Sequence, residues 1–128
     1  IKGTKDKVET FLSFAKENSK TVHLLGASTK GNTLLQYCNI TDKDIPYAAE
    51  VNPDKFGLVT LGSDIEILSE DASLAMNPDF YFCPIWHFKR SILNNPKMQE
   101  YLAKGGKLVF PLPTFSIITK DGETPYGN

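Results

Sequence analysis

The stretch from Val22 to Cys38 most constrains the fold of this chain. An apolar run is followed by a loop of small and polar residues from Gly26 to Gly31, and then by apolar residues at helical spacing from Leu34 onward. This pattern predicts a strand, a tight turn and the start of a helix. The loop has the composition of an anion-binding turn, because unpaired backbone N–H groups and the helix dipole favour negative charge at a helix N-terminus.

Further apolar runs alternate with helical patterns along the rest of the chain. The expected strands are Thr21–Leu25, Tyr47–Val51, Ile65–Leu68, Phe80–Trp86 with its end at Pro84, Lys107–Pro111 and Thr114–Thr119. The expected helices are Lys5–Asn18 with Thr4 as a cap, Thr29–Cys38, Asp71–Ala75 after a Ser69 cap, Phe88–Leu93 and Lys97–Lys104. The first should carry one apolar stripe of Val8, Phe11, Leu12 and Ala15, and Asn39 should end the second in the left-handed conformation. Such alternation predicts an α/β fold in three layers, with a mostly parallel sheet of about four or five strands and helices on both faces.

The length of 128 residues suits a single domain. We expect residues 1–20 to form a leading helical segment and residues 120–128 to form a flexible polar tail. The chain opens with Ile1 and enters a helix at once, from which we expect an excised C-terminal or internal domain of a larger protein.

Composition and charge narrow the function classes. The chain is 41% hydrophobic and 23% charged with a net charge of −1, so it offers no global basic field for nucleic acid or for an anionic membrane. It has no signal-peptide pattern and no apolar run near the roughly 20 residues that a membrane span requires. Cys38 and Cys83 belong to no C-x-x-C pair and are expected to be buried free thiols. These features predict a cytoplasmic protein.

The Gly26 loop departs from two phosphate-binding motifs by one residue each. Asn32 stands where a P-loop needs lysine to neutralise the terminal phosphates, which argues against nucleotide hydrolysis. Ser28 stands where the dinucleotide fingerprint needs its middle glycine, which argues against NAD and FAD.

The loop still concentrates many hydrogen-bond donors in one turn. We therefore predict an anion or sugar-phosphate site here, and the alternative is a hydrophilic turn with a good helix cap. The candidate substrate-binding residues are Gly26, Ala27, Ser28, Thr29, Lys30, Gly31, Asn32 and Thr33.

A second group of candidates follows the most apolar run of the chain. Trp86 and Phe88 are suited to stack on a nucleobase, His87 to act as an acid or base, and Lys89 to pair with phosphate. The alternative is that these aromatic residues pack a helix onto the sheet. His23 is expected to be a core histidine. The sequence shows no nucleophile with a partner, no carboxylate pair and no metal-ligand set, so we predict no catalytic residue and no metal site in these residues.

Four groups of residues resemble a known family. They are Gly26–Leu35; Asn52 and Pro53 with Lys55, Gly57, Thr60 and Gly62; Pro84 with Trp86–Lys89; and Gly105–Pro113. In order and spacing they resemble the C-terminal domain of S-adenosylmethionine-dependent C-methyltransferases that act on nucleotide-linked sugars. A departure is Ile85, because family members often have proline directly before the tryptophan.

The resemblance implies a Rossmann-like substrate-recognition domain, with Asn52 and Lys55 added to the substrate-binding residues. It also implies a parent enzyme that binds zinc in an N-terminal region and S-adenosylmethionine in a middle domain, and hence no cofactor bound by this domain alone. The expected partners are a nucleotide-diphosphate sugar and the donor-binding domain of the same chain, with no nucleic acid and no membrane. Two alternatives stay open: a docking domain that binds no small molecule, and a domain that binds S-adenosylmethionine through Glu50.

Overall fold

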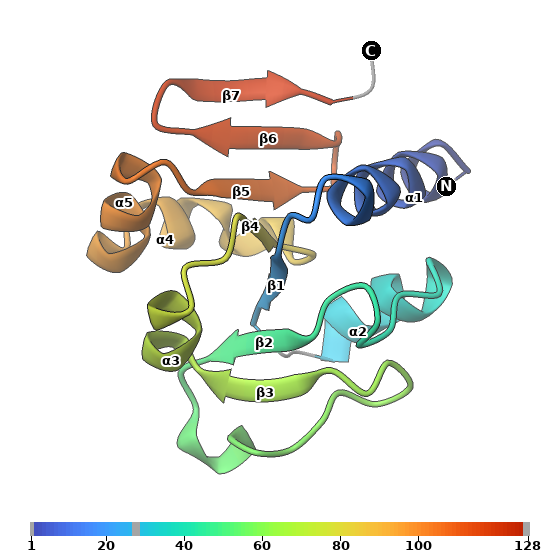
Figure 1. Ribbon diagram of the computed structural model, residues 1–128. Helices are drawn as coiled ribbons and strands as arrows, with labels where there is room; N and C mark the ends of the chain where they lie inside the picture. Colours follow the sequence, from blue (N-terminus) through green and yellow to red (C-terminus); the bar gives the residue numbers. More distant parts are fainter. Residues whose placement is uncertain (1, 27–28, 127–128) are drawn as a thin grey trace.

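A single mixed sheet organises the computed structural model, which describes residues 2–26 and 29–126 (Figure 1). Its strands are β1 (Val22–Leu25), β2 (Tyr47–Glu50), β3 (Glu66–Ser69), β4 (Phe80–Phe82), β5 (Lys107–Phe110), β6 (Ser116–Thr119) and β7 (Gly122–Pro125). The α-helices are α1 (Lys2–Glu17), α2 (Thr29–Tyr37), α3 (Glu70–Ala75), α4 (Lys89–Leu93) and α5 (Pro96–Ala103), and two 3-10 helices are η1 (Pro53–Lys55) and η2 (Trp86–Phe88).

The sheet has the order β3-β2-β1-β4-β5-β6-β7. The first five strands in this order pair in parallel. Strand β6 pairs antiparallel with β5, and β7 pairs antiparallel with β6. The predicted α/β class is therefore confirmed, but the expected four or five mostly parallel strands are replaced by a mixed sheet of seven.

The tail expected from residue 120 onward forms β7 instead of a frayed end. All four residues of this strand are exposed and polar or small, so no apolar run marks it in the sequence. An edge strand needs only backbone pairing to one neighbour, and β7 obtains it from β6 through a turn at residues 120–121. The sequence therefore correctly indicates a polar segment and wrongly indicates its conformation.

Helices cover both faces of the sheet, with α1 and α2 on one side and α3, α4 and α5 on the other (Figure 1). The predicted apolar stripe of α1 is confirmed, because Val8, Phe11, Leu12 and Ala15 are all buried against the sheet. The Phe11 ring meets that of Phe80 edge to face with centroids 5.0 Å apart. Full burial of such a side chain contributes about 2–3 kcal/mol to folding.

Local signals fix several helix ends as predicted. The Ser69 hydroxyl accepts a hydrogen bond of 3.0 Å from the Ala72 amide and so caps α3. Asn39, just beyond α2, adopts the left-handed conformation with φ of 56°. Thr4 is not a cap, because α1 begins before it at Lys2.

A chain of buried polar side chains crosses the face covered by α3. His23 in β1 is 3% exposed, and its Nδ1 lies 2.7 Å from the Ser73 hydroxyl, which in turn lies 2.7 Å from the Tyr81 hydroxyl. Burial lowers the pKa of His23 to about 4 and raises that of Tyr81 to about 12. The prediction of a core histidine is confirmed, and the imidazole is neutral when the chain is folded at pH 7.

Both cysteines are buried and free, as predicted. Burial raises the pKa of the Cys83 thiol, which keeps it protonated and unreactive at neutral pH. Among the helices of residues 2–26 and 29–126, none is both long and apolar enough to cross a membrane.

The neutral, buried His23 predicts a pH-dependent stability. Below its ordinary pKa of 6.5 the unfolded chain takes up a proton at His23 that the folded chain takes up only near pH 4. The free energy of unfolding should therefore fall by up to about 3 kcal/mol between pH 6.5 and pH 4. Urea titrations across this range measure it.

The matched comparison is His23→Gln against His87→Gln, since His87 lies on the surface. The first variant should remove the histidine contribution to the slope and the second should keep it. Equal slopes in the wild-type and His23→Gln chains would show that His23 does not carry the effect.

Candidate functional site

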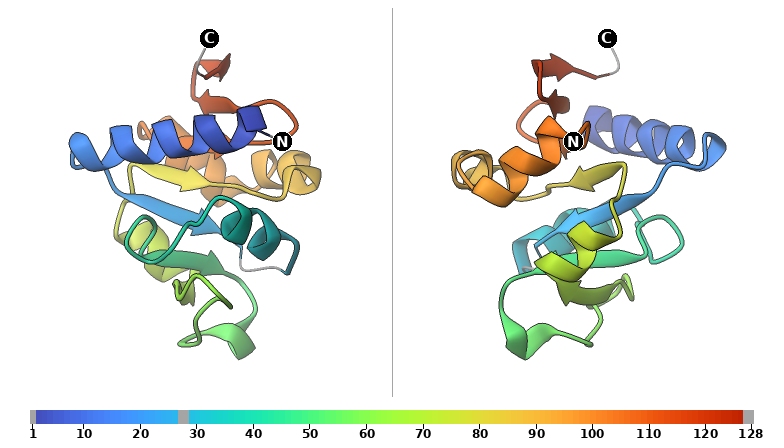
Figure 2. Two further views of the ribbon diagram at one scale, coloured as in Figure 1. Left: turned by 90° about the vertical axis from the view of Figure 1, so that its right-hand side faces the viewer. Right: turned by 60° about the vertical axis from the view of Figure 1, so that its left-hand side comes forward.

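The candidate residues gather at the carboxyl edge of the sheet, beside its central strand. Strand β1 lies between β2 and β4: the chain leaves β1 for β2 and later returns from β3 to β4 on the other side of β1. At such a switch point open α/β sheets bind ligands in a crevice outside the carboxyl ends of the strands, so this edge is the candidate crevice. In the left panel of Figure 2 the arrows of β1, β2 and β4 point to the right, and α2 and the η2–α4 segment lie at that end. The structure thus brings together segments about 60 residues apart in the sequence.

Gly26 ends β1 and begins the predicted anion-binding loop. Its φ of 87° is a left-handed conformation that favours glycine, and its N–H donates a hydrogen bond of 2.8 Å to the Ala49 carbonyl of β2. The helix after the loop begins at Thr29, as predicted. Ala27 and Ser28 lie outside the described residues, as do the side chains of Thr29 and Lys30.

Asn32 occupies the first turn of α2 with an unusual amide. Its Oδ1 is buried and accepts no hydrogen bond from any residue within the two described segments. Gly31 beside it is buried, and Thr33 is exposed. A buried acceptor without a donor costs about 1–3 kcal/mol, so such an atom at the mouth of a crevice is suited to accept a hydrogen bond from a ligand.

The polar side chains at and just after the end of β2, Glu50 and Asn52, bond mainly to backbone amides of the following turn. The Glu50 carboxylate accepts hydrogen bonds from the amides of Val51 and Asn52, at 2.9 and 3.0 Å. The Asn52 side chain accepts one of 3.1 Å from the Asp54 amide and so caps η1. Lys55 Nζ lies 3.9 Å from Glu50 Oε1. Asn52 and Lys55 therefore lie just after the carboxyl end of β2, and the Asn52 side chain has a structural role as the cap of η1.

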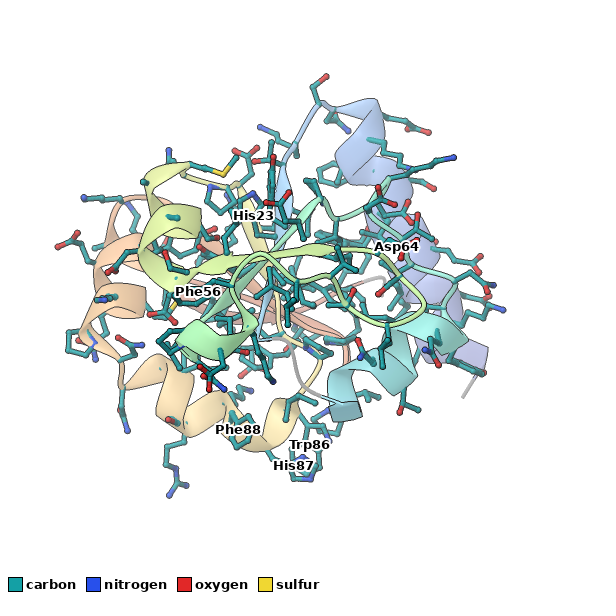
Figure 3. All side chains as sticks on the ribbon, turned by 90° about the horizontal axis from the view of Figure 1, so that it is seen from below. His23, Phe56, Asp64, Trp86, His87 and Phe88 are labelled. Atoms are coloured by element: carbon teal, nitrogen blue, oxygen red, sulfur yellow. The ribbon has the colours of Figure 1, made fainter. Side chains whose placement is uncertain are left out.

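The three aromatic candidates of η2 project from the same edge (Figure 3). Trp86 is 40% exposed and Phe88 is 58% exposed, so neither side chain is buried between a helix and the sheet. The rings of Trp86 and His87 stack with centroids 4.1 Å apart and an interplanar angle of 25°. This stack presents aromatic surface to solvent, which is suited to hold a planar ring.

Lys89 already has a strong partner. Its ammonium lies 2.8 and 2.7 Å from the two carboxylate oxygens of Glu123 in β7, and 5.5 Å from the Phe110 ring centroid. The Ser116 hydroxyl donates a further hydrogen bond of 2.6 Å to Glu123. These bonds from Lys89 and Ser116 lower the pKa of Glu123. Lys89 thus fastens the start of α4 to the antiparallel end of the sheet.

A neighbouring hollow contains residues that the sequence did not single out. The η2–α4 hollow is lined by Trp86, His87, Lys89, Arg90, Leu93 and Asn94. The spacing of three or four residues between Trp86, Arg90 and Leu93 places them along one side of a helical segment, and this periodicity could have revealed Arg90.

A metal centre is not supported by the described part of the chain. Within residues 2–26 and 29–126 no group of three or more histidine, cysteine, aspartate or glutamate side chains could hold an ion. The polar groups at this edge include amides, backbone N–H groups, one imidazole and the facing charges of Glu50 and Lys55. Such groups bind and orient a polar ligand by hydrogen bonds.

The sequence of this chain is similar to sequences of known proteins. Residues 1–113 match the family model described as the C-methyltransferase C-terminal domain, a range that includes all the candidate residues. Over 104 residues, or 81% of this chain, the sequence is 32% identical to the C-methyltransferase NovU of Streptomyces niveus. The matched part is 24% of that relative, so the chain spans about a quarter of its length.

Stability measurements can separate ligand-binding from structural polar groups at this edge. Asn32→Leu removes an unpaired buried acceptor and introduces a better helix former, so the free energy of unfolding should be unchanged or rise by about 1 kcal/mol. Asn52→Ala removes a helix cap and should lower it by about 1 kcal/mol. Urea denaturation of the two variants provides the comparison. A loss above about 1 kcal/mol in Asn32→Leu would assign Asn32 to the fold.

Proposed function

The chain belongs to the family of C-methyltransferase C-terminal domains, and from this premise we propose that it recognises the acceptor substrate of its parent enzyme. The proposed acceptor is a nucleotide-linked sugar. It binds in the crevice between the start of α2, the exit of β2 and η2. These residues contribute recognition and no chemical step of methyl transfer.

The observation that carries this proposal is the unpaired amide oxygen of Asn32. A protein interior satisfies nearly all of its polar atoms, and an exception at the carboxyl edge beside β1 has its simplest explanation in a ligand that donates the missing hydrogen bond. Sugar hydroxyls and nucleobase N–H groups are donors of this kind. The exposed Trp86 ring provides the adjoining surface for a base.

The methyl donor, S-adenosylmethionine, has its site elsewhere in the parent enzyme under this proposal. The acidic residue that would hold the donor ribose is Glu50, but its Oε2 accepts hydrogen bonds from two backbone amides and its Oε1 faces Lys55. A zinc-binding region would also belong to that remaining part. The two buried free thiols suit a reducing compartment such as the cytoplasm, where we expect the parent to act.

Titration with a thymidine-diphospho-sugar, followed by NMR, tests this proposal. The amide signals of Gly26, Gly31, Asn32 and Thr33 and the indole signal of Trp86 should shift together. Asn32→Leu should raise the dissociation constant about tenfold, because the variant loses one ligand hydrogen bond. Asn18→Leu, at the end of α1 near the opposite edge, is the control. Unchanged loop signals at millimolar ligand would contradict the proposal.

A second candidate function is docking without a small molecule, and the segment 51–61 favours it. Five large apolar side chains of this segment are exposed: Val51, Phe56, Leu58, Val59 and Leu61. Val51 is 72% exposed and Leu61 is 77% exposed. Clustered apolar surface of this kind is typical of a protein interface.

A double variant, Leu58→Ser with Leu61→Ser, separates the two candidates in a complete methyltransferase that carries this domain. If the segment docks onto the catalytic part, kcat should fall several-fold while KM for the acceptor stays constant. Met76→Ser, at another exposed apolar side chain, is the matched control. A wild-type kcat in the double variant would remove the docking candidate. Asn32→Leu should instead raise KM.

A further inference from the structure

The η2–α4 hollow combines aromatic surface with positive charge. Its volume is about 670 Å³, which is large enough for a nucleotide-sized ligand. The Trp86–His87 stack forms one part of its wall, and Lys89 and Arg90 are its two cations. No carboxylate is among its described lining residues, whereas the hollow between α3 and α5 is lined by both Asp71 and Glu100.

The two cations differ in what they already bind. The ammonium of Lys89 is neutralised by both oxygens of Glu123. Arg90 is exposed and forms no ion pair with any residue of 2–26 or 29–126. A guanidinium also matches a phosphate group with two parallel N–H bonds, which an ammonium cannot do.

We propose that Arg90 is the residue of the η2–α4 hollow that binds the phosphates of a nucleotide whose base stacks on Trp86. Lys89, which the sequence suggested for this task, is a positioning residue that holds η2 and α4 against β7 through Glu123. This inference rests on the proposed function, since it names the anion-binding residue of the same recognition domain.

The sequence offers a direct optical probe of this site. Trp86 is the single tryptophan and Arg90 the single arginine among the 128 residues. Titration of the chain with thymidine diphosphate, followed by Trp86 fluorescence, therefore reports on the hollow alone. The base should quench the fluorescence, and Arg90→Gln should raise the dissociation constant at least about tenfold, because one charge-assisted bidentate contact is lost.

Three further variants separate binding from structural effects. Lys89→Gln should weaken binding less than Arg90→Gln. Glu123→Gln should weaken binding about as much as Lys89→Gln does, because it breaks the same ion pair that positions η2 and α4. Lys120→Gln removes an exposed cation elsewhere and should leave the dissociation constant unchanged. Circular dichroism of each variant verifies that it is folded.

Several results would overturn the inference. One is equal affinity in Arg90→Gln and Lys120→Gln, and another is equal affinity for thymidine and thymidine diphosphate. A third is unchanged Trp86 fluorescence while the NMR signals of Gly26 and Asn32 still shift with the nucleotide-sugar. The first result, with the shifts of Gly26 and Asn32 retained, would leave the proposed function intact and remove only the role of Arg90. The third would also remove Trp86 from the proposed site, and the absence of both signals would remove both proposals.

Discussion

The double pairing of β1 is the constraint on which the rest of the structure depends. This strand is flanked in parallel by β2 and β4, and both of its faces are buried. Its start is tied to β4 by Thr21 and Asp79: the Asp79 carboxylate accepts the Thr21 amide at 2.8 Å, and the Thr21 hydroxyl accepts the Asp79 amide at 3.0 Å. Because these bonds fix the register at the amino ends, the carboxyl ends of both strands meet at one edge.

Two sets of buried polar atoms in this chain differ in whether the chain itself supplies their hydrogen-bond partners. In the buried row of His23, Ser73 and Tyr81 each side chain has a hydrogen-bond partner within the chain. At the carboxyl edge, Asn32 Oδ1 is buried and has none among the described residues. Both sets are shielded from water, so burial alone cannot explain the difference. An unsatisfied buried acceptor lowers the stability of the fold, and this is the basis of the proposal that a ligand donates a hydrogen bond to Asn32.

Much of the fold could be predicted from the sequence because its signals are local. The stripe of α1, the Ser69 cap and the left-handed Asn39 each depend on residues within a few positions of one another, and all three are confirmed. Strand β7 could not be predicted, since it has no apolar run and its partners, the β6 backbone and the distant Lys89, are not visible in its own sequence.

The candidate site shows the same division. The position of the Gly26 loop followed from the strand-turn-helix pattern. The exposure of Trp86 and Phe88 argues against the alternative that they pack a helix onto the sheet, and their role in binding stays a proposal. The partner of Lys89 was hidden, because Glu123 is 34 residues away in a segment that gives no strand signal. Whether a charged surface side chain is paired depends on such distant contacts. Residue type alone gives only the sign of its charge.

Under the proposal for Arg90, the antiparallel end of the sheet bears on ligand recognition as well as on folding. The region matched by the family ends at residue 113, before β6 and β7 begin. Yet Glu123 of β7 neutralises one of the two cations in the η2–α4 hollow and, with Ser116 of β6, anchors the first residue of α4. Under that proposal, the β6–β7 hairpin outside the matched region sets which cation of the hollow is available to a ligand. Variation in this hairpin is a means by which relatives with the same η2 residues could differ in the anions that they accept.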